Sequence, residues 1–528
     1  MAASPKKILI LGGGFAGVYT ARSLERLLRA DEAEITLVNR ENYWVYQPML
    51  PEVISGSIGL TDVVSPIRRL CPRTRLVMRE VEAIDLAQRS VTVSPGFRPV
   101  ATVLTYDYLV IALGNITNFY GMPGMMENAM PFRTLADALA VRNHLIHALE
   151  EADCEDDPDL RKKLLTFVVG GGGFSGVEAI AELNDFIREV KGNYQRLRNE
   201  EVRCVLVQSG ERILPEMAEP LAVFAQKLLR KRGVEIILKD RLRAATSERA
   251  ILKSGVEIPC KTIISTVPSA APPVIEGLAC KKDKGKLLVD SGLCLEGYAD
   301  EVWALGDCAS IKTAGGNTAP PTAQHATREA ATAAANIVAA IRGGSKSVFA
   351  FEGLGTLGSL GHGSAVAQIF GLKISGLLAW FLWRSIYLFK LPGMNRKFRV
   401  SMDWFIRLLF APDLAQLRMT GDGNIRNQHF EAGDAIFNQG DLGDSVYVIR
   451  AGECEVWRDG KFLAMLGAGE YFGEMAVMSD QSRNATVRAK SALDVLLIPK
   501  DDFARLGENL PAFAEVFREM AAKRGAGA

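Results

Sequence analysis

Apolar runs and glycine-rich turns alternate along the first part of the chain. Residues 6–11 form a short apolar run, residues 12–17 read Gly-Gly-Gly-Phe-Ala-Gly, and an alanine- and leucine-rich segment with helical periodicity continues to Leu28. The same order returns later, with an apolar run at 165–169 and a glycine-rich turn at 171–176. Short apolar runs predict buried strands, and the periodic segments predict helices. The pattern therefore predicts two strand–turn–helix units, each opening an α/β domain.

The first glycine-rich turn has the spacing of a dinucleotide-binding loop. In such a loop the first glycine permits the turn, the second lets the backbone approach a pyrophosphate, and the third lets helix and strand pack closely. The helix N-terminus then faces the negative charge. The next strand, expected at 34–38, ends at Asn39, where an acid usually binds the ribose, although Asn still bonds a hydroxyl. The expected contacts of this loop are Gly12, Gly14, Phe15, Ala16, Gly17, Asn39 and Arg40.

The second loop predicts a second dinucleotide site. One Gly-x-Gly-x-x-Gly motif is a weak signal, but two copies, each between a strand and a helix, are strong evidence. The strand after this loop, expected at 202–207, ends at Gln208, with Arg212 close behind. An acid there would repel a 2′-phosphate, so Gln208 removes the repulsion and Arg212 supplies attraction. NADPH is left open beside NADH; the plainer alternative is that Gln208 binds the NADH ribose less strongly. The expected contacts are Gly171, Gly173, Phe174, Ser175, Gly176, Gln208 and Arg212.

Two further apolar runs end in glycine turns. One, at 106–113, ends in Gly114, and the other, at 301–305, ends in Gly306 and Asp307. If Asp307 holds the ribityl-pyrophosphate end of a flavin, the helix that follows begins beside the reactive ring. Insertion of one nucleotide domain into the other places a nicotinamide against this flavin. Hydride transfer needs little more, because the chemistry belongs to the cofactors.

Composition limits the chemistry. The 62 basic and 61 acidic residues argue against nucleic-acid binding. Eight cysteines are scattered without a CxxC pair, which removes a redox-active disulfide and suits a reducing compartment. His144 and His147 share a face of a helix expected at 135–149 but lack nearby ligands, so no metal site is expected. The acidic run at 150–159 predicts a solvated loop, and the opening MAASPKKILIL is not a signal peptide.

These motifs together resemble the type II NADH dehydrogenase family, single-chain flavoprotein NADH:quinone oxidoreductases. The resemblance covers residues 1–417 and rests on both glycine loops, Gly306-Asp307, Tyr46–Leu50 (Tyr-Gln-Pro-Met-Leu) and Ala323–Ala326 (Ala-Gln-His-Ala). It implies FAD and NADH as cofactors. It also implies that Gln47 and Pro48 lie near the flavin ring, and Glu178 and Glu182 near the nicotinamide.

The resemblance also implies an acceptor site. It places the Ala-Gln pair at a quinone pocket beside the dimethylbenzene edge of the flavin. We expect Gln324, His325 and Glu178 to position substrates and handle protons near the flavin. An ordinary pKa near neutrality would suit His325 as a proton donor, although a packed helix histidine is equally expected. Many members have a second Gln where this chain has Arg328, which leaves the quinone preference open.

Aromatic and basic residues are interleaved after residue 370. The longest charge-free stretch, 374–383, is far shorter than the roughly 20 residues that cross a bilayer. A charge such as Arg384 near mid-bilayer would cost roughly 3 kcal/mol or more. Helices lying in the headgroup region suit this composition, and the resemblance requires access to a membrane quinone. We expect peripheral attachment on the cytoplasmic side of the inner (plasma) membrane; burial in a homodimer interface is left open. The interleaved aromatic residues are Trp380, Trp383, Tyr387 and Trp404.

The last hundred or so residues change character. Turns at closely spaced positions from Gly433 onward separate short alternating strands, which is β-roll spacing. Segments 471–476 (Tyr-Phe-Gly-Glu-Met-Ala) and 482–487 (Ser-Arg-Asn-Ala-Thr-Val) resemble the phosphate-binding cassette of a cyclic nucleotide-binding domain. Glu474 would accept the ribose 2′-hydroxyl and Arg483 would pair with the cyclic phosphate. The expected contacts are Gly473, Glu474, Met475, Ala476, Arg483, Asn484 and Ala485.

Three features of this region stay open. Asn484 departs from the usual Ser, Thr or Ala, which leaves cAMP and cGMP as alternatives. A cassette kept only as a structural module is the other interpretation. A polar linker is expected at 419–424, and a helix at 501–524 is expected either to cap the pocket or to pack on the core.

The sequence thus predicts an α/β protein with two Rossmann-like dinucleotide-binding domains, amphipathic membrane-associating helices and a C-terminal β-roll. The expected function is a respiratory-chain NAD(P)H:quinone oxidoreductase that pumps no protons and is adjusted by a cyclic nucleotide. Alternatives are a soluble NAD(P)H-dependent flavin reductase, a sulfide:quinone oxidoreductase, disfavoured because residues 309–453 hold no cysteine, and a cyclic-nucleotide sensor without turnover. The expected domains are FAD-binding at 1–115 and 290–345, NAD(P)H-binding at 116–289, membrane-associating at 346–417 and cyclic nucleotide-binding-like at 418–528.

Overall fold

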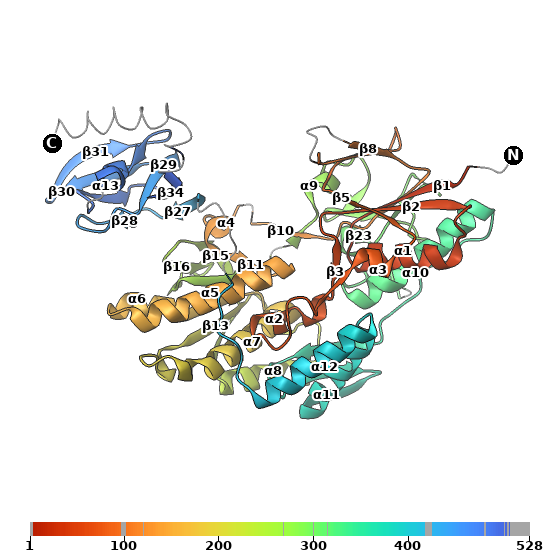
Figure 1. Ribbon diagram of the computed structural model, residues 1–528, viewed down its shortest axis with the longest axis horizontal. Helices are drawn as coiled ribbons and strands as arrows, with labels where there is room; N and C mark the ends of the chain where they lie inside the picture. The colour runs from red at the N-terminus through yellow and green to blue at the C-terminus, as the bar shows by residue number, and fades with distance from the viewer. Residues whose placement is uncertain are drawn as a thin grey trace.

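The computed structural model describes residues 4–96, 102–119, 121–267, 269–298, 300–313, 315–417, 425–479, 482–500, 502, 503 and 506. Two parallel sheets with their helices, a small antiparallel sheet followed by two helices, and a β-roll follow one another along the chain (Figure 1). The α/β class predicted from the sequence is confirmed. The expected linker at 419–424 and most of the expected helix at 501–524 lie outside the described residues.

The first sheet is parallel, in the order β22-β9-β1-β2-β5. Its last strand, β22, comes from far along the chain, so an inserted segment separates it from the others. Helix α1 (Phe15–Leu27) and the alanine-rich α10 (Ala323–Arg342) pack side by side. The strands are β1 (Lys6–Leu11), β2 (Ala33–Asn39), β5 (Arg75–Met78), β9 (Tyr108–Ile111) and β22 (Val302–Ala304).

The second sheet is also parallel, in the order β11-β18-β12-β13-β14. The strands are β11 (Met130–Pro131), β12 (Thr166–Gly170), β13 (Arg203–Gln208), β14 (Val234–Leu238) and β18 (Thr262–Ser265). Its helices are α5 (Leu135–Cys154), α6 (Pro158–Leu164), α7 (Phe174–Val190) and α8 (Glu219–Lys231). An antiparallel sheet joins β15 (Leu242–Ala245), β16 (Arg249–Leu252) and β17 (Glu257–Pro259).

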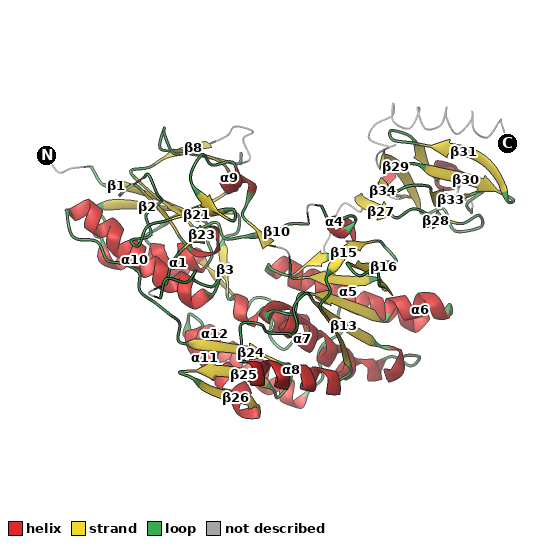
Figure 2. Cartoon of the chain, turned by 180° about the vertical axis from the view of Figure 1, so that it is seen from behind, coloured by secondary structure: helices red, strands yellow, loops and turns green. Residues whose placement is uncertain are grey.

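The chain crosses between the two units at an antiparallel pair, β10 (Ile116–Thr117) and β19 (Ser269–Ala270). Figure 2 shows this crossing between the two sheets. Helix α2 (Pro51–Ile54) of the first unit packs against α5 and α7 of the second. Shorter elements near the first unit are β3 (Tyr43–Val45), β4 (Val64–Pro66), α3 (Ile67–Leu70), β6 (Val81–Asp85), β7 (Ser90–Val93), β8 (Thr102–Thr105), α9 (Pro273–Glu276), β20 (Lys282–Asp283), β21 (Lys286–Leu288) and β23 (Ala309–Ser310).

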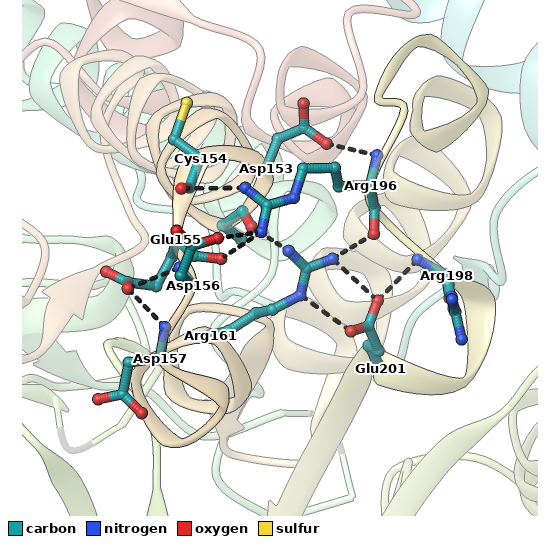
Figure 3. Close-up of polar contacts among 10 residues, drawn as sticks. Asp153, Cys154, Glu155, Asp156, Asp157, Arg161, Arg196, Arg198 and Glu201 are labelled. Carbon is teal, nitrogen blue, oxygen red and sulfur yellow. Dashed lines mark hydrogen bonds and ion pairs between the residues drawn. The ribbon is translucent and has the colours of Figure 1, made fainter.

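The acidic run at 150–159 is largely exposed, as its composition predicts, but most of it is helical and not a loop. Helix α5 continues to Cys154, and α6 begins at Pro158, where proline suits the first turn. The short connection is bound by arginines: Arg196 donates to the carbonyl oxygens of Cys154 (3.2 Å) and Glu155 (3.1 Å), as Figure 3 shows. Arg161 reaches the carbonyl oxygen of Ala152 in α5 at 2.7 Å. The two arginines therefore hold the backbone of the connection in place, and Arg196 also pairs with Asp156.

Two helices follow a small antiparallel sheet in the region after residue 354. The sheet joins β24 (Gly355–Ser359), β25 (Ala365–Ile369) and β26 (Leu372–Gly376), and α11 (Leu377–Lys390) and α12 (Met394–Leu409) come next. Among the described helices, none is long and apolar enough to span a membrane. Residues 411–417 then run along α5, where Asn143 and Leu417 exchange two hydrogen bonds of 2.8 and 3.0 Å.

The C-terminal unit is a β-roll of two four-stranded antiparallel sheets, β27-β34-β29-β32 and β28-β33-β30-β31. Aromatic and branched residues of both sheets meet in one core. The elements are β27 (Arg426–Phe430), β28 (Ala435–Phe437), β29 (Ser445–Ala451), β30 (Cys454–Arg458), β31 (Lys461–Leu466), β32 (Tyr471–Phe472), α13 (Glu474–Ser479), β33 (Thr486–Ala489) and β34 (Leu493–Pro499).

Candidate functional site

The first glycine loop has a geometry that only glycine permits at two positions. Gly12 has φ +103°, and a Cβ there would lie 2.2 Å from the carbonyl oxygen of Ala112. A Cβ at Gly17 would lie 1.8 Å from the carbonyl oxygen of Gly12, so this glycine lets α1 touch the loop. Gly14 instead faces open space, with no atom within 4 Å of its Cβ position. The loop is therefore closely packed behind and open in front, as a pyrophosphate-binding loop requires.

One cavity of about 560 Å³ lies in front of this loop. Its size is in the range of small-molecule and cofactor sites. Ten of the residues predicted for the flavin site line it: Gly12, Gly14, Phe15, Ala16, Asn39, Arg40, Gln47, Gly114, Gly306 and Asp307. Gly17 and Pro48 are not among its lining residues. Thr322, Ala323 and Ala326 bring the start of α10 to the cavity. The residues present thus fit a long dinucleotide such as FAD.

Asp307 lies in this cavity wall among groups that the motifs did not reveal. Burial raises the pKa of Asp307, and Arg133, whose Nη2 lies 3.4 Å from Oδ2, opposes that rise. Glu329 of α10 accepts the N–H of Gly306 at 2.8 Å, and burial raises its pKa to about 7. Glu329 therefore holds the Gly306–Asp307 turn against α10. Its one sequence signal is a carboxylate on the buried face of an alanine-rich helix.

The second glycine loop repeats the first. Gly171 has φ +107°, a Cβ at Gly176 would lie 1.8 Å from the carbonyl oxygen of Gly171, and Gly173 is nearly open. Gln208 accepts the N–H of Gly172 at 3.0 Å, just as Asn39 accepts the N–H of Gly13 at 2.8 Å. The two loops thus share both their backbone shape and an amide side chain that braces them.

The other residues predicted to contact a nucleotide at the second loop, Phe174, Ser175 and Arg212, differ in their surroundings. The Arg212 guanidinium donates to the carbonyl oxygens of Pro215 and Met217, both at 3.3 Å. A Cβ at Gly358 of β24 would lie 2.9 Å from the Phe174 ring, so this ring packs on β24. Ser175 is exposed in the first turn of α7. The Arg212 side chain is thus engaged by backbone carbonyl groups three and five residues further along the chain.

Glu178 lies in a buried carboxylate cluster between α7, α2 and the C-terminal region. Its Oε1 accepts the N–H of Ser359 at 2.9 Å, and burial raises its pKa to about 8. Glu182, one turn further along α7, accepts from the Ser55 hydroxyl at 2.5 Å, and burial likewise raises its pKa to about 8. Glu52 joins them, with a pKa raised to about 7 chiefly by burial. Burial therefore raises the pKa of all three carboxyl groups, and the charge of Arg384 opposes that rise at Glu52.

Gln324 and His325 lie at the start of α10 but are engaged with their neighbours. Gln324 donates to the carbonyl oxygen of Gly355 and accepts the N–H of Leu354, both at 3.1 Å. His325 has its Nδ1 2.7 Å from the Thr322 hydroxyl and its ring edge-on to Phe351. Burial, followed by the charge of Arg328, lowers the pKa of His325. The pKa of His325 thus lies below its ordinary value, and the ring is buried, as the alternative of a packed helix histidine expects.

The tryptophans of the C-terminal helices face inward, contrary to the expectation of an interfacial aromatic belt. Trp380, Trp383 and Trp404 are buried. The Arg384 guanidinium stacks between Trp380 (3.9 Å) and Trp404 (4.5 Å) and pairs with Glu52 at 3.6 Å. Arg384 thus pairs with a buried carboxylate from a distant part of the chain. The alternation of aromatic and basic residues in the sequence does not reveal this pairing.

The outer face of these helices is apolar and exposed. It carries phenylalanines, leucines and methionines at helical spacing, and Phe389 is 81% and Phe398 67% exposed. Many exposed apolar residues on two helices that contact each other indicate an interaction surface. We call it the outer apolar face; its members are Leu377, Leu378, Phe381, Phe389, Met394, Phe398, Met402, Phe405, Ile406, Leu408 and Leu409.

The predicted cassette of the β-roll brings its acid and arginine to the same region. Glu474 begins α13 and is buried. Arg483 is also buried; it donates to the carbonyl oxygens of Gly473 (2.7 Å) and Ser445 (2.8 Å), and its guanidinium lies 4.2 Å from the centre of the Phe437 ring. Burial lowers the pKa of Arg483. Asn484 contacts the sulfur of Met475 at 3.6 Å, and Ala476 and Ala485 are buried beside them.

Two glycine-loop sheets joined by a paired crossing, with a dinucleotide cavity at the first loop, define a two-dinucleotide flavoprotein oxidoreductase. Family models agree: pyridine nucleotide-disulphide oxidoreductase matches residues 6–330, the NDH2 C-terminal domain 354–413 and the cyclic nucleotide-binding domain 427–509. Because the first model spans more than half of the sequence, the chain belongs to the pyridine nucleotide-disulphide oxidoreductase family. The resemblance predicted from the sequence, including the C-terminal cyclic nucleotide-binding domain, is confirmed.

Individual relatives point the same way. A probable NADH dehydrogenase of Dictyostelium discoideum is 28% identical over 418 residues, 78% of this chain and 91% of the relative. A type II NADH:quinone oxidoreductase of Staphylococcus epidermidis is 29% identical over 408 residues, 76% of this chain and 99% of the relative.

Solved structures share the fold. NDH2 of Plasmodium falciparum in complex with NADH has a TM-score of 0.70 at 19% identity, covering 78% of this chain and 99% of that one. The sulfide:quinone oxidoreductase of Aquifex aeolicus has a TM-score of 0.59 at 19% identity, covering 78% and 96%.

Proposed function

We propose that this chain is an FAD-dependent NADH:quinone oxidoreductase that pumps no protons. Relatives that match this chain over 99% of their own length are named type II NADH:quinone oxidoreductase. The NDH2 C-terminal domain model matches residues 354–413. The observation that carries the proposal is the cavity of about 560 Å³ between the first glycine loop and the start of α10. FAD is the cofactor held there and NADH the donor at the second loop.

The residues of this chain would bind, orient and hold protons. When bound, FAD accepts a hydride from NADH and passes two electrons on to a quinone. The first loop offers backbone N–H groups and a helix N-terminus to the pyrophosphate, and Asp307 faces the same cavity. Glu178 and Glu182, whose pKa burial raises to about 8, would hold protons within the buried carboxylate cluster. Gln324 fixes the Leu354–Gly355 backbone beside the start of α10.

Steady-state turnover tests this activity. Purified protein should contain FAD, bleach it with NADH and oxidise NADH rapidly once a quinone in lipid vesicles is added. NADH that reduces the flavin without quinone-dependent turnover would leave the soluble flavin reductase as the better description. Quinone reduction that depends on sulfide would instead place the chain with the sulfide:quinone oxidoreductases.

We infer that the outer apolar face binds a membrane surface, on the cytoplasmic side of the inner (plasma) membrane. Basic residues of the same helices, Lys390, Arg396 and Lys397 among them, suit anionic headgroups. Phe389→Glu with Phe398→Glu should abolish co-sedimentation with vesicles, and Phe462→Glu, an exposed residue of the β-roll, is the matched control. If the double variant stays bound and instead becomes monomeric, the face is a homodimer interface.

We also propose that the cassette binds cAMP or cGMP through Arg483 and Glu474. Both side chains are buried next to the backbone of Gly473–Ala476, which supplies further donors. Calorimetric titration of each nucleotide into the parent and into Arg483→Ala tests this. Equal binding by both proteins would make the cassette a structural module.

A further inference from the structure

The β-roll is docked on the second nucleotide-binding unit. Strand β27 lies against α4 (Met125–Asn128), and the ring of buried His429 packs on Gly124, where a Cβ would lie 2.8 Å from its Cδ2. Asp434, just before β28, pairs with Arg249 at the start of β16, with 2.9 Å between Oδ1 and Nη1. These two side chains are only 15% and 21% exposed. Figure 1 shows β27 of the β-roll beside α4.

On the β-roll side, Asp434 is tied to the cassette. Arg483 stacks on the ring of Phe437, three residues after Asp434. Strand β28 pairs with β33, which follows Arg483 along the chain, and Ala489 of β33 donates to the carbonyl oxygen of Asp434 at 2.9 Å. A cyclic phosphate that draws Arg483 must compete with Phe437 and with the carbonyls of Gly473 and Ser445. Ligand binding therefore acts on β28, the strand that begins directly after Asp434.

On the other side, Arg249 is tied to the NADH loop. It starts β16, which pairs with β15, and Leu242 of β15 rests on Gly170, where a Cβ would lie 2.4 Å from Leu242 Cδ1. Gly170 directly precedes Gly171 of the second glycine loop. Ala245, at the end of β15, donates to the carbonyl oxygen of Pro123, beside α4, at 3.0 Å. The β-roll thus contacts a surface whose strand β15 also packs against the residue before the second glycine loop.

We propose that cyclic-nucleotide binding changes the rate of flavin reduction by NADH through the Asp434–Arg249 contact, and leaves flavin reoxidation by quinone unchanged. This presupposes the NADH:quinone activity proposed above. The start of α10 lines the flavin cavity in the first unit, and α11 lies on the side of the second unit away from the β-roll in both views (Figures 1 and 2). The docked surface therefore reaches the donor half of the reaction.

Stopped-flow measurement on the full-length flavoprotein separates the two halves. Without oxygen, bleaching by NADH and recolouring by a quinone are followed with no nucleotide, with cAMP and with cGMP. We expect one nucleotide to change the bleaching rate about fivefold or more, a typical coupling between sites, with recolouring constant within about twofold. Asp434→Asn should still bind the nucleotide but lose this response. Glu453→Gln, which breaks the exposed Lys490–Glu453 pair at 3.7 Å elsewhere on the β-roll, should keep it.

Arg249→Gln breaks the same contact from the opposite side, so a misfolded variant on one side does not leave the question open. The proposal is overturned if the nucleotide acts on recolouring alone, if both contact variants respond like the parent, or if neither nucleotide binds. Turnover without nucleotide is unaffected by these outcomes, so the oxidoreductase assignment stands or falls separately.

Discussion

Burial of Glu178 should make the stability of this protein fall with rising pH, and Glu178→Gln should remove the part of that fall that Glu178 causes. The pKa of Glu178 is raised from 4.5 to about 8 because the carboxyl group is buried. A carboxyl whose folded pKa is raised destabilises the fold once the unfolded chain ionises, so the loss develops from about pH 4.5 and is complete above pH 8. At about 1.4 kcal/mol for each pH unit, the full loss is about 5 kcal/mol. Gln keeps the oxygen that accepts from Ser359 and has no charge to bury.

Denaturant unfolding of parent and variant at pH 5 and pH 9 measures this difference. The variant should be equal to or less stable than the parent at pH 5 and more stable by several kcal/mol at pH 9. Glu219→Gln, at an exposed carboxylate that begins α8, should show no such crossover. A parent–variant difference that is the same at both pH values would refute the assignment of Glu178 as a protonated buried group.

Further variants test the loops and the helix anchor. Gly17→Ala should prevent the first loop from forming and yield protein without FAD, whereas Gly14→Ala should fold and bind FAD more weakly, as flavin content and fluorescence titration would show. Arg384→Met leaves Glu52 buried without its ion pair and should cost roughly 3–5 kcal/mol of unfolding free energy at pH 8, less at pH 6, where Glu52 is protonated. Gln208→Glu should lower the NADPH/NADH ratio of kcat/KM about tenfold or more, and an unchanged ratio would show that residue 208 does not face the ribose.

Local patterns predicted the two nucleotide loops and the β-roll because the responsible interactions lie close together in sequence. A strand, a glycine turn and a helix within one short stretch leave little choice of fold, and ten of the residues predicted around the flavin line one cavity. Pairings across the chain were not predictable in this way. Arg384 bonds a carboxylate of α2 that precedes it by hundreds of residues, and Arg196 orders the acidic turn after α5. Composition suggested that Arg384 lies among headgroups, but its side chain is mostly buried, and that the acidic run is a loop, but most of that exposed run is helical.

The same limit explains why the direction of a helix face needed the structure. Leucine, phenylalanine and tryptophan are all apolar, so the sequence of α11 and α12 does not distinguish the buried side from the exposed side. The tryptophans turn inward because Trp404 donates to Glu52 at 3.1 Å and two indole rings sandwich Arg384. The apolar residues of α11 and α12 that do not take part in this buried cluster form the outer apolar face.

Asn39 and Gln208 stand where a carboxylate is usual, and each amide affects both the shape of its glycine loop and the charge near the ribose. Each accepts a loop N–H, from Gly13 at 2.8 Å and from Gly172 at 3.0 Å, so each braces its glycine loop as a carboxylate would. Neither brings a negative charge to the place where a ribose is expected to lie. Since Glu in place of Gln208 would keep the brace and add the charge, a change in NADPH preference in that variant would report electrostatics at the ribose and not a disturbed loop.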